Sequence, residues 1–157
     1  MTRVGIGYDI HALRRGRPFV LGGVRIPFPK GPVGHSDGDA LIHALVDAVL
    51  GAMGEGDIGD HFPDSEKRWK GADSALFVHE VRRLLKKRHF KIVHLDSVVL
   101  IEAPRLAPYK IKIRRHLAGL FGLPLSAVSV KAKTNEGFGA VGKNQAVACY
   151  AIAGLRS

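Results

Sequence analysis

One stretch decides the fold of this chain: His35-Ser36-Asp37-Gly38-Asp39-Ala40-Leu41-Ile42-His43. The residues that follow it, to Met53, are apolar almost all round, which is typical of a buried helix. Ser36 or Asp37 is the expected cap at the start of this helix, because short polar side chains accept hydrogen bonds from the first free backbone N–H groups. The stretch therefore predicts a helix sunk in the core.

A polar stripe nevertheless runs down this helix through Asp39, His43 and Asp47. Positions four apart stack on one line of a helical surface. Burial of imidazole with carboxylates is unfavourable unless each group has a partner, and a metal ion is a natural one. We interpret His43 as a metal ligand whose companions come from elsewhere in the chain.

The chain has 157 residues and 46% hydrophobic content, which suits one domain spanning residues 1–157. It contains no apolar run long enough to cross a bilayer, and its N-terminus lacks a signal-peptide pattern. We expect a cytoplasmic protein with no membrane partner. The single cysteine, Cys149, lies in an apolar alternating run, so a buried filler is expected there rather than a nucleophile.

Charge is segregated along the sequence. The net charge is +10, but residues 31–66 hold no lysine or arginine, while eight of the fourteen acidic residues and three of the eight histidines fall there. Acids and imidazoles without basic neighbours suit a cation site, and the positive surplus around them suits a polyanionic substrate.

The chain opens with a strand in which Val4, Ile6, Tyr8 and Ile10 alternate with a second set of residues, Gly5, Gly7, Asp9 and His11. Alternation points Asp9 and His11 the same way, and the two glycines leave room for another segment to approach closely. Residues 18–28 read as a hairpin that turns at Gly22-Gly23.

The rest of the chain alternates between helices and strands. Residues 55–71 read as a long loop; helices are expected from Asp73 and from Pro108 to Gly122, and strands over residues 94–103, 128–134 and 144–153. This order favours an α/β (α+β) sandwich, with a mixed four-stranded sheet plus a hairpin and helices packed on one face.

The first chemical constellation is Asp9, His11 and His43. Two imidazoles and a carboxylate are a normal zinc ligand set, and three protein ligands leave the fourth position open for a substrate oxygen. The alternative is that Asp9 pairs with His11 and that His43 is a core histidine bonded to Asp39 or Asp47. Spacing alone leaves both readings open.

Two further patterns are weaker. Residues 137–142 fit the G-x-G-x-x-G dinucleotide fingerprint, but a strand follows them and no acidic residue comes after Glu136, so we read them as a tight loop. Residues 131–136 place Lys131 and Lys133 on one face with Thr134 and Glu136 just beyond, where a phosphate and its magnesium ion could bind; an ordinary edge strand explains them equally well.

Five blocks together resemble the 2-C-methyl-D-erythritol 2,4-cyclodiphosphate synthase family over essentially the whole chain. They are Asp9-Ile10-His11, residues 35–39 with His43, residues 57–59 with residues 62–64, residues 103–105, and residues 131–137. The resemblance implies a homotrimer with active sites between neighbouring subunits. It also implies conversion of 4-diphosphocytidyl-2-C-methyl-D-erythritol 2-phosphate to the cyclic diphosphate and CMP, in the non-mevalonate isoprenoid pathway.

The resemblance also implies roles for individual residues. Asp9, His11 and His43 are the expected zinc (or other transition-metal) ligands, and Glu136 the expected ligand of a second ion, Mg²⁺ or Mn²⁺, bridging the substrate diphosphate. His35 and Thr134 are the expected catalytic residues. Substrate contacts are expected from Asp9, His11, His35, Ser36, Asp57, Ile58, Gly59, Phe62, Asp64, Ala103, Arg105, Lys133, Thr134, Glu136 and Lys143.

Three positions depart from the pattern of the family, namely Lys133, Ala140 and Lys143. The last two bear on a cavity along the trimer axis, and because lysine lacks the bidentate fork of arginine we expect weak or absent binding of isoprenoid diphosphates there. Two other classes remain alternatives: a metal-dependent phosphohydrolase, which would use the same three ligands, and a nucleic-acid-binding module, which would rest on the +10 charge. The basic runs at residues 82–91 and 110–115 lack interleaved aromatic residues, so we expect no nucleic acid partner.

Overall fold

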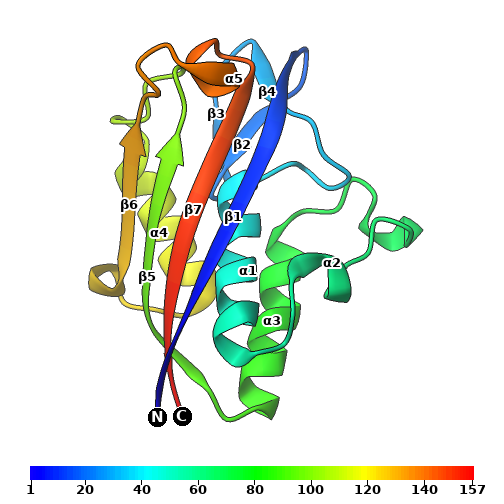
Figure 1. The fold of residues 1–157 in the computed structure, drawn as a ribbon, viewed down its shortest axis with the longest axis vertical. Helices are drawn as coiled ribbons and strands as arrows, with labels where there is room; N and C mark the ends of the chain where they lie inside the picture. The colour runs from blue at the N-terminus through cyan, green and yellow to red at the C-terminus, as the bar shows by residue number, and fades with distance from the viewer.

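The computed structural model describes residues 1–157 and contains a five-stranded sheet with helices against one of its faces (Figure 1). The strand order is β4-β1-β7-β5-β6, and only β5 and β6 run parallel. The strands are β1 (Thr2–Arg15), β4 (Lys30–Pro32), β5 (Lys91–Leu100), β6 (Val128–Lys133) and β7 (Ala146–Arg156). The mixed sheet is confirmed, but the expectation of four strands omitted β4, whose glycine and proline are residues that strands disfavour.

The predicted hairpin is present as β2 (Phe19–Leu21) and β3 (Val24–Ile26). Gly22 and Gly23 both have positive φ, 58° and 72°, as a two-residue type I′ turn requires. A side chain at either position would also collide with helix α4 (Lys110–Phe121), because a Cβ atom would lie 2.5 Å from Ile113 at Gly22 and 2.2 Å from His116 at Gly23.

The predicted buried helix is α1 (Ala40–Met53), and most of its residues are fully buried. Its cap is Asp39, whose side chain accepts from the backbone N–H of Ile42, so the expectation of Ser36 or Asp37 was wrong. Both of those side chains have other partners: Ser36 lies against His43, and Asp37 accepts from the backbone N–H of Asp39.

Helix α1 rests directly on the backbone of β1, at the two glycines that were expected to permit a close approach. A Cβ atom would lie 2.1 Å from the carbonyl oxygen of Ala48 at Gly5, and 1.9 Å from that of Ala44 at Gly7. No side chain fits in either space. The glycine-bearing face of β1 therefore fixes the depth of α1 on the sheet.

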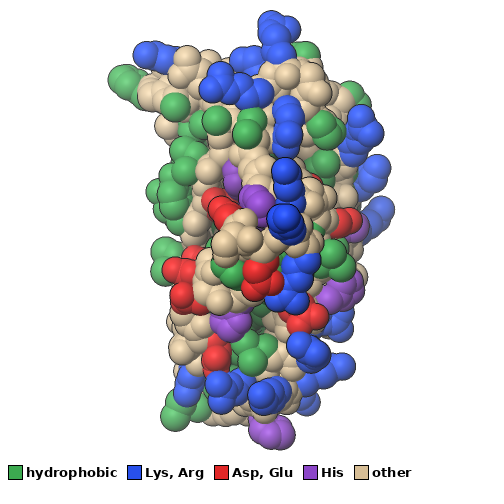
Figure 2. All heavy atoms as spheres, turned by 90° about the vertical axis from the view of Figure 1, so that its right-hand side faces the viewer, with side chains coloured by type: hydrophobic (Ala, Val, Ile, Leu, Met, Phe, Trp, Pro, Cys, Tyr) green, Lys and Arg blue, Asp and Glu red, His purple; other side chains and the backbone are tan.

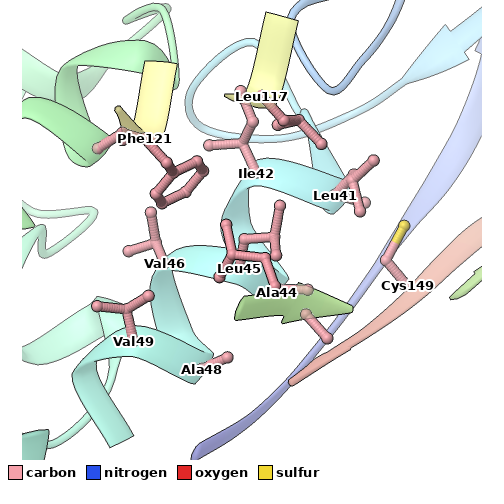
Figure 3. Close-up of a cluster of buried hydrophobic side chains, with 14 of the residues drawn as sticks. Leu41, Ile42, Ala44, Leu45, Val46, Ala48, Val49, Leu117, Phe121 and Cys149 are labelled. Atoms are coloured by element: carbon pink, nitrogen blue, oxygen red, sulfur yellow. The ribbon is translucent and has the colours of Figure 1, made fainter. Parts of the chain in front are cut away.

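Two longer helices complete the helical layer, α3 (Ala75–Lys87) and α4 (Lys110–Phe121). Figure 3 shows Leu117 and Phe121 of α4 against the apolar side chains of α1, with Cys149 of β7 nearby. Helix α4 begins two residues after Pro108 and ends, as expected, at Gly122 in the left-handed conformation. The fully buried Cys149 agrees with its interpretation as core filler.

The loop at residues 55–71 contains more structure than expected. It holds a short helix, α2 (Ile58–His61), closed by a capping box between Asp57 and Asp60, and a 3₁₀ turn, η1 (Lys67–Trp69). A second 3₁₀ turn, η2 (Leu125–Ala127), and a single helical turn, α5 (Gly139–Gly142), complete the chain. The glycine-rich residues 137–142 are followed by strand β7 and not by a long helix, which agrees with our conclusion that they are not a dinucleotide-binding motif.

The face of the sheet turned away from the helices, which we call the outer face, carries a row of uncovered apolar side chains. On β1 these are Val4, Ile6, Tyr8 and Ile10, between 45% and 69% exposed, and on β7 they are Tyr150 and Ile152. In Figure 1 this face is turned toward the viewer. No helix in the structure has both the length and the hydropathy that a bilayer-spanning segment needs.

Candidate functional site

Strand β1 and helix α1 bring the three predicted metal ligands together. The Nε2 atom of His11 lies 2.8 Å from Oδ2 of Asp9, Nδ1 of His43 lies 3.0 Å from the same oxygen, and the two ring nitrogens are 3.2 Å apart. No fourth histidine, cysteine, aspartate or glutamate joins the group. The three donor atoms converge on one point and leave one side open.

The second nitrogen of each imidazole is held by the protein. Nδ1 of His11 lies 2.8 Å from the carbonyl oxygen of Val33, an acceptor, so this nitrogen carries a proton and Nε2 is the nitrogen that faces Asp9. Nε2 of His43 lies 3.0 Å from Oγ of Ser36 and 2.9 Å from Oγ of Ser74. Both rings thus present one nitrogen to the centre of the group.

The three donors suit a divalent transition metal. Ligand atoms about 2.0 Å from a tetrahedral zinc ion lie roughly 3.3 Å from one another, close to the spacings found here. Burial alone would raise the pKa of Asp9, but hydrogen bonds with His11 and His43 outweigh it and lower that pKa. Burial would lower the pKa of His11, but its hydrogen bond to Asp9 raises it. Asp9 is therefore ionised, as a carboxylate ligand must be.

The three polar residues of the α1 stripe have three different partners. Asp39 accepts from the backbone N–H groups of Gly22 and Gly23 as well as Ile42, and so ties the hairpin turn to α1. Asp47 accepts from the backbone N–H of Ile58 and ties down α2. Burial raises the pKa of both carboxyl groups, partly offset by these backbone hydrogen bonds. Only His43 of the stripe belongs to the metal group, so the alternative pairing of His43 with Asp39 or Asp47 is absent.

A cavity of about 480 Å³ opens over the three ligands; we call it the metal pocket. Besides Asp9 and His11, its walls include six of the residues expected to contact substrate: His35, Ser36, Ile58, Gly59, Phe62 and Asp64. Asp57 does not line it, because its side chain caps α2 by accepting from the backbone N–H of Asp60. Figure 2 shows histidine and acidic side chains gathered in the middle of this side of the molecule, with lysines and arginines around them.

A second cavity, of about 370 Å³, lies at the ends of β5 and β6; we call it the edge pocket. Arg105, Lys133 and Thr134 line it, while Ala103 does not. Glu136 and Lys143 line neither pocket, although Glu136 accepts a hydrogen bond from Thr134 Oγ1 at 2.9 Å. Strands β7 and β5 separate β1 from β6, so the two pockets lie at opposite edges of the sheet.

Several residues of the metal pocket were not identified from the sequence. Trp69 and Phe77 form part of its wall and pack against the ring of Phe62, and Ser74 and Asp37 lie behind His43. Nothing in the local sequence indicates that Ser74 contacts His43, because Asp73-Ser74 is an ordinary pattern for the start of a helix. The largest cavity, about 790 Å³, lies on the other side of Phe62 and Trp69, against α3, and Phe62 is the one expected site residue in its wall.

Comparison with known proteins gives one consistent result. The family model described as "YgbB family" matches residues 2–156. A 2-C-methyl-D-erythritol 2,4-cyclodiphosphate synthase from Pelotomaculum thermopropionicum is 50% identical over 151 residues, which cover 96% of this chain and 93% of that protein.

Solved structures agree with this result. A structure of 2C-methyl-D-erythritol-2,4-cyclodiphosphate synthase in a CDP-bound form superposes with a TM-score of 0.91 at 40% identity and covers 98% of this chain and 100% of its own. The bifunctional IspDF from Campylobacter jejuni has a TM-score of 0.90 at 33% identity, and the match covers 99% of this chain and 42% of that one.

Proposed function

This chain belongs to the YgbB family, and from that membership we infer that it is an enzyme of the non-mevalonate isoprenoid pathway that forms 2-C-methyl-D-erythritol 2,4-cyclodiphosphate. Its substrate is 4-diphosphocytidyl-2-C-methyl-D-erythritol 2-phosphate. An oxygen of the 2-phosphate bonds to the β-phosphorus, the bond from that phosphorus to the CMP oxygen breaks, and CMP leaves. We propose that the reaction is a metal-dependent, cyclising phosphorus–oxygen lyase reaction.

We propose that Asp9, His11 and His43 hold a zinc ion or another divalent transition metal, and that Glu136 holds a second ion, Mg²⁺ or Mn²⁺, with the substrate diphosphate. The convergence of one carboxylate oxygen and two ring nitrogens within 3.2 Å supports the first site. Bound there, a divalent ion supplies positive charge beside phosphoryl oxygens and helps to align them.

The reaction needs no general base from the protein, because the attacking phosphate oxygen is already anionic at neutral pH. The obstacle is repulsion between that oxygen and the anionic diphosphate, which donors such as Ser36, Lys133 and the hydroxyl of Thr134 reduce. His35 supports this proposal, since its buried Nε2 atom has no partner within the protein and is therefore available to a phosphate.

We propose that each active site forms between two copies of the chain, in a homotrimer. The metal pocket has walls for the methylerythritol phosphate, and the edge pocket, with Arg105 and Lys133, has the character expected for the cytidine diphosphate part. One substrate molecule has to reach both, yet a single chain holds them at opposite edges of its sheet. Contact between chains would resolve this separation.

The outer face supports the same arrangement. Val4, Ile6, Tyr8 and Ile10 form a continuous apolar row on β1, extended by Tyr150 and Ile152 on β7, and uncovered apolar faces of this kind commonly mark subunit interfaces. Figure 2 shows hydrophobic side chains along its left-hand edge, which is the side turned toward the viewer in Figure 1. We also propose that residues 1–157 form one domain, supported by a single main cluster of 37 buried residues.

The observation that carries this function, beyond family membership, is the meeting of Asp9, His11 and His43 at the floor of the metal pocket. The test is His43→Ala, with His79→Ala on the exposed side of α3 as the matched control. We expect His43→Ala to lose its zinc and to lower the rate of CMP release about 10³-fold or more, and His79→Ala to change neither.

Metal content and CMP release are measured on the same preparations, and phosphorus NMR identifies the product. A cyclic diphosphate supports the cyclisation, whereas a linear monophosphate would support the phosphohydrolase alternative. Full turnover by His43→Ala with no bound metal would contradict the proposed metal site.

A further inference from the structure

The Nε2 atom of His43 faces two hydroxyl groups, and it can donate to only one of them. Oγ of Ser36 lies 3.0 Å away and Oγ of Ser74 lies 2.9 Å away. A hydroxyl can donate or accept, so these distances alone leave the proton of the imidazole on either nitrogen. The position of that proton matters, because only a deprotonated Nδ1 can bind a metal ion beside Asp9 and His11.

Asp37 removes the ambiguity for Ser74. Its carboxylate is hydrogen-bonded to the Ser74 hydroxyl through Oδ1 and accepts the backbone N–H of Ser74 through Oδ2 at 3.0 Å. An ionised carboxylate has no proton to give, so the hydroxyl of Ser74 donates to Asp37. Its oxygen is then left as an acceptor for the N–H of His43.

We propose that Asp37 and Ser74 are positioning residues that fix the proton of His43 on Nε2 and so present the Nδ1 lone pair to the metal. The hydrogen bonds run in one direction, from His43 to Ser74 and from Ser74 to Asp37. Ser36 is then not needed as an acceptor, and its hydroxyl proton is free to point at a substrate phosphate. This inference rests on the proposed metal site and adds two residues that make no contact with the metal or the substrate.

The surroundings of Ser74 support a dedicated role. Ser74 is fully buried, and it is the N-cap residue of α3, yet its side chain makes no capping hydrogen bond to that helix. Serine at this position normally accepts from a backbone N–H in the first turn. Here the hydroxyl of Ser74 lies against His43 and Asp37 instead, and the neighbouring Asp73 accepts from the backbone N–H of Ala75 at the start of α3.

Backbone hydrogen bonds also fix Asp37 and Ser74 relative to each other. The backbone N–H of Asp37 donates to the carbonyl oxygen of Ala72 at 3.1 Å, and that of Gly71 donates to His35 at 2.7 Å. These bonds join the segment before α1 to the segment before α3. Asp37 and Ser74 therefore stay in register with each other, as a fixed ring orientation requires.

The test compares Ser74→Ala with Ser97→Ala, a matched buried serine of β5 that donates to the carbonyl oxygen of Ser129. Zinc affinity is measured on the full chain by competition with a chromogenic chelator. Loss of a group that orients a metal-bound histidine typically weakens metal binding about 10- to 100-fold. We expect this loss for Ser74→Ala and unchanged zinc affinity for Ser97→Ala.

A second variant covers the case in which Ser74→Ala does not fold. Asp37→Asn keeps the shape of the side chain but introduces an N–H donor toward Ser74, which permits the hydrogen bonds to reverse. We expect Asp37→Asn to bind zinc about tenfold more weakly than the wild type. In ¹⁵N-histidine-labelled, zinc-loaded protein, we expect NMR to find a slowly exchanging Nε2 proton on His43 of the wild type and a faster-exchanging one in Asp37→Asn.

Wild-type zinc affinity and an unchanged exchange rate of the His43 Nε2 proton in these variants would overturn the positioning role while leaving the metal site intact. Absence of zinc binding by the wild type itself would instead overturn the proposed metal site. The two failures are therefore distinguishable.

Discussion

The metal pocket and the edge pocket differ in how they are built. The metal pocket is formed by β1, α1 and the segment around α2, and its key side chains are fixed by partners within the chain. The edge pocket lies at the ends of two strands, and its three expected residues, Arg105, Lys133 and Thr134, are all exposed. The metal pocket holds its whole candidate set of metal ligands within a single chain, whereas the edge pocket has an open side. The difference fits the proposal that a complete active site needs the metal pocket of one chain and the edge pocket of another.

The strongest test of this comparison combines two inactive variants. His43→Ala damages only the metal pocket and should reduce CMP release about 10³-fold or more, whereas Lys133→Ala damages only the edge pocket and should reduce it about 10²-fold. If the site forms between chains, random assembly after co-expression pairs an intact metal pocket with an intact edge pocket at about a quarter of the interfaces. We expect CMP release to recover to about that share of the wild-type rate.

The control is a mixture of the two variants purified separately and combined without subunit exchange. Recovery in neither sample would mean that one chain supplies both parts of each site.

A substitution on the outer face should separate assembly from metal binding. Ile6→Lys places a charge in the apolar row of β1, where Ile6 is 69% exposed in the single chain. We expect light scattering to show dissociation to a species near 17.0 kDa, together with loss of most CMP release and unchanged zinc affinity. Leu76→Lys, at an exposed apolar position on α3, is the matched control and should stay assembled. An assembled, active Ile6→Lys enzyme would contradict the proposed interface.

The smallest expected effect concerns the contact between α1 and β1. Gly7→Ala forces α1 away from the strand, because its Cβ would lie 1.9 Å from the carbonyl oxygen of Ala44. We expect the free energy of unfolding in urea to fall by about 1–3 kcal/mol, and zinc affinity to fall with it, since α1 carries His43 and β1 carries Asp9 and His11.

Gly51→Ala is the control on the same helix. Its Cβ would have no neighbour nearer than 3.8 Å, and alanine favours helix, so we expect unchanged or slightly higher stability, by about 0.5–1 kcal/mol. Equal losses in the two variants would mean that close packing at Gly7 is not what fixes α1.

Local periods in the sequence made Asp9, His11 and His43 candidates for the metal group, but spacing alone left the alternative pairing open, and the family resemblance favoured the metal site. Alternation along β1 puts Asp9 and His11 on one face, and the four-residue spacing of α1 singles out His43. Gly5 and Gly7, on the same face of β1, predicted a close approach by another segment, and α1 is that segment. Family resemblance named the other expected site residues, of which Asp57, Ala103, Glu136 and Lys143 line neither pocket.

Other features depend on contacts between distant segments and left no local sign. Alternation defines two faces of β1 but does not say which one the helices cover, so the exposure of Ile6 and Tyr8 was not foreseen. The cap of α1 is Asp39 because Asp37 is engaged with Ser74, which lies 37 residues away. The strand β4 and the short helix α2 are too brief to produce a period.

The contact of α1 with Gly5 and Gly7 has a consequence for how this protein can change over time. The spacing between helix and strand is set by main-chain atoms, which every amino acid shares, and not by the bulk of core side chains. Substitutions among the leucines and valines of the core during evolution can change the stability of the protein without moving His43 relative to Asp9 and His11. The absence of a side chain at Gly5 and Gly7 therefore keeps His43 at a constant distance from Asp9 and His11.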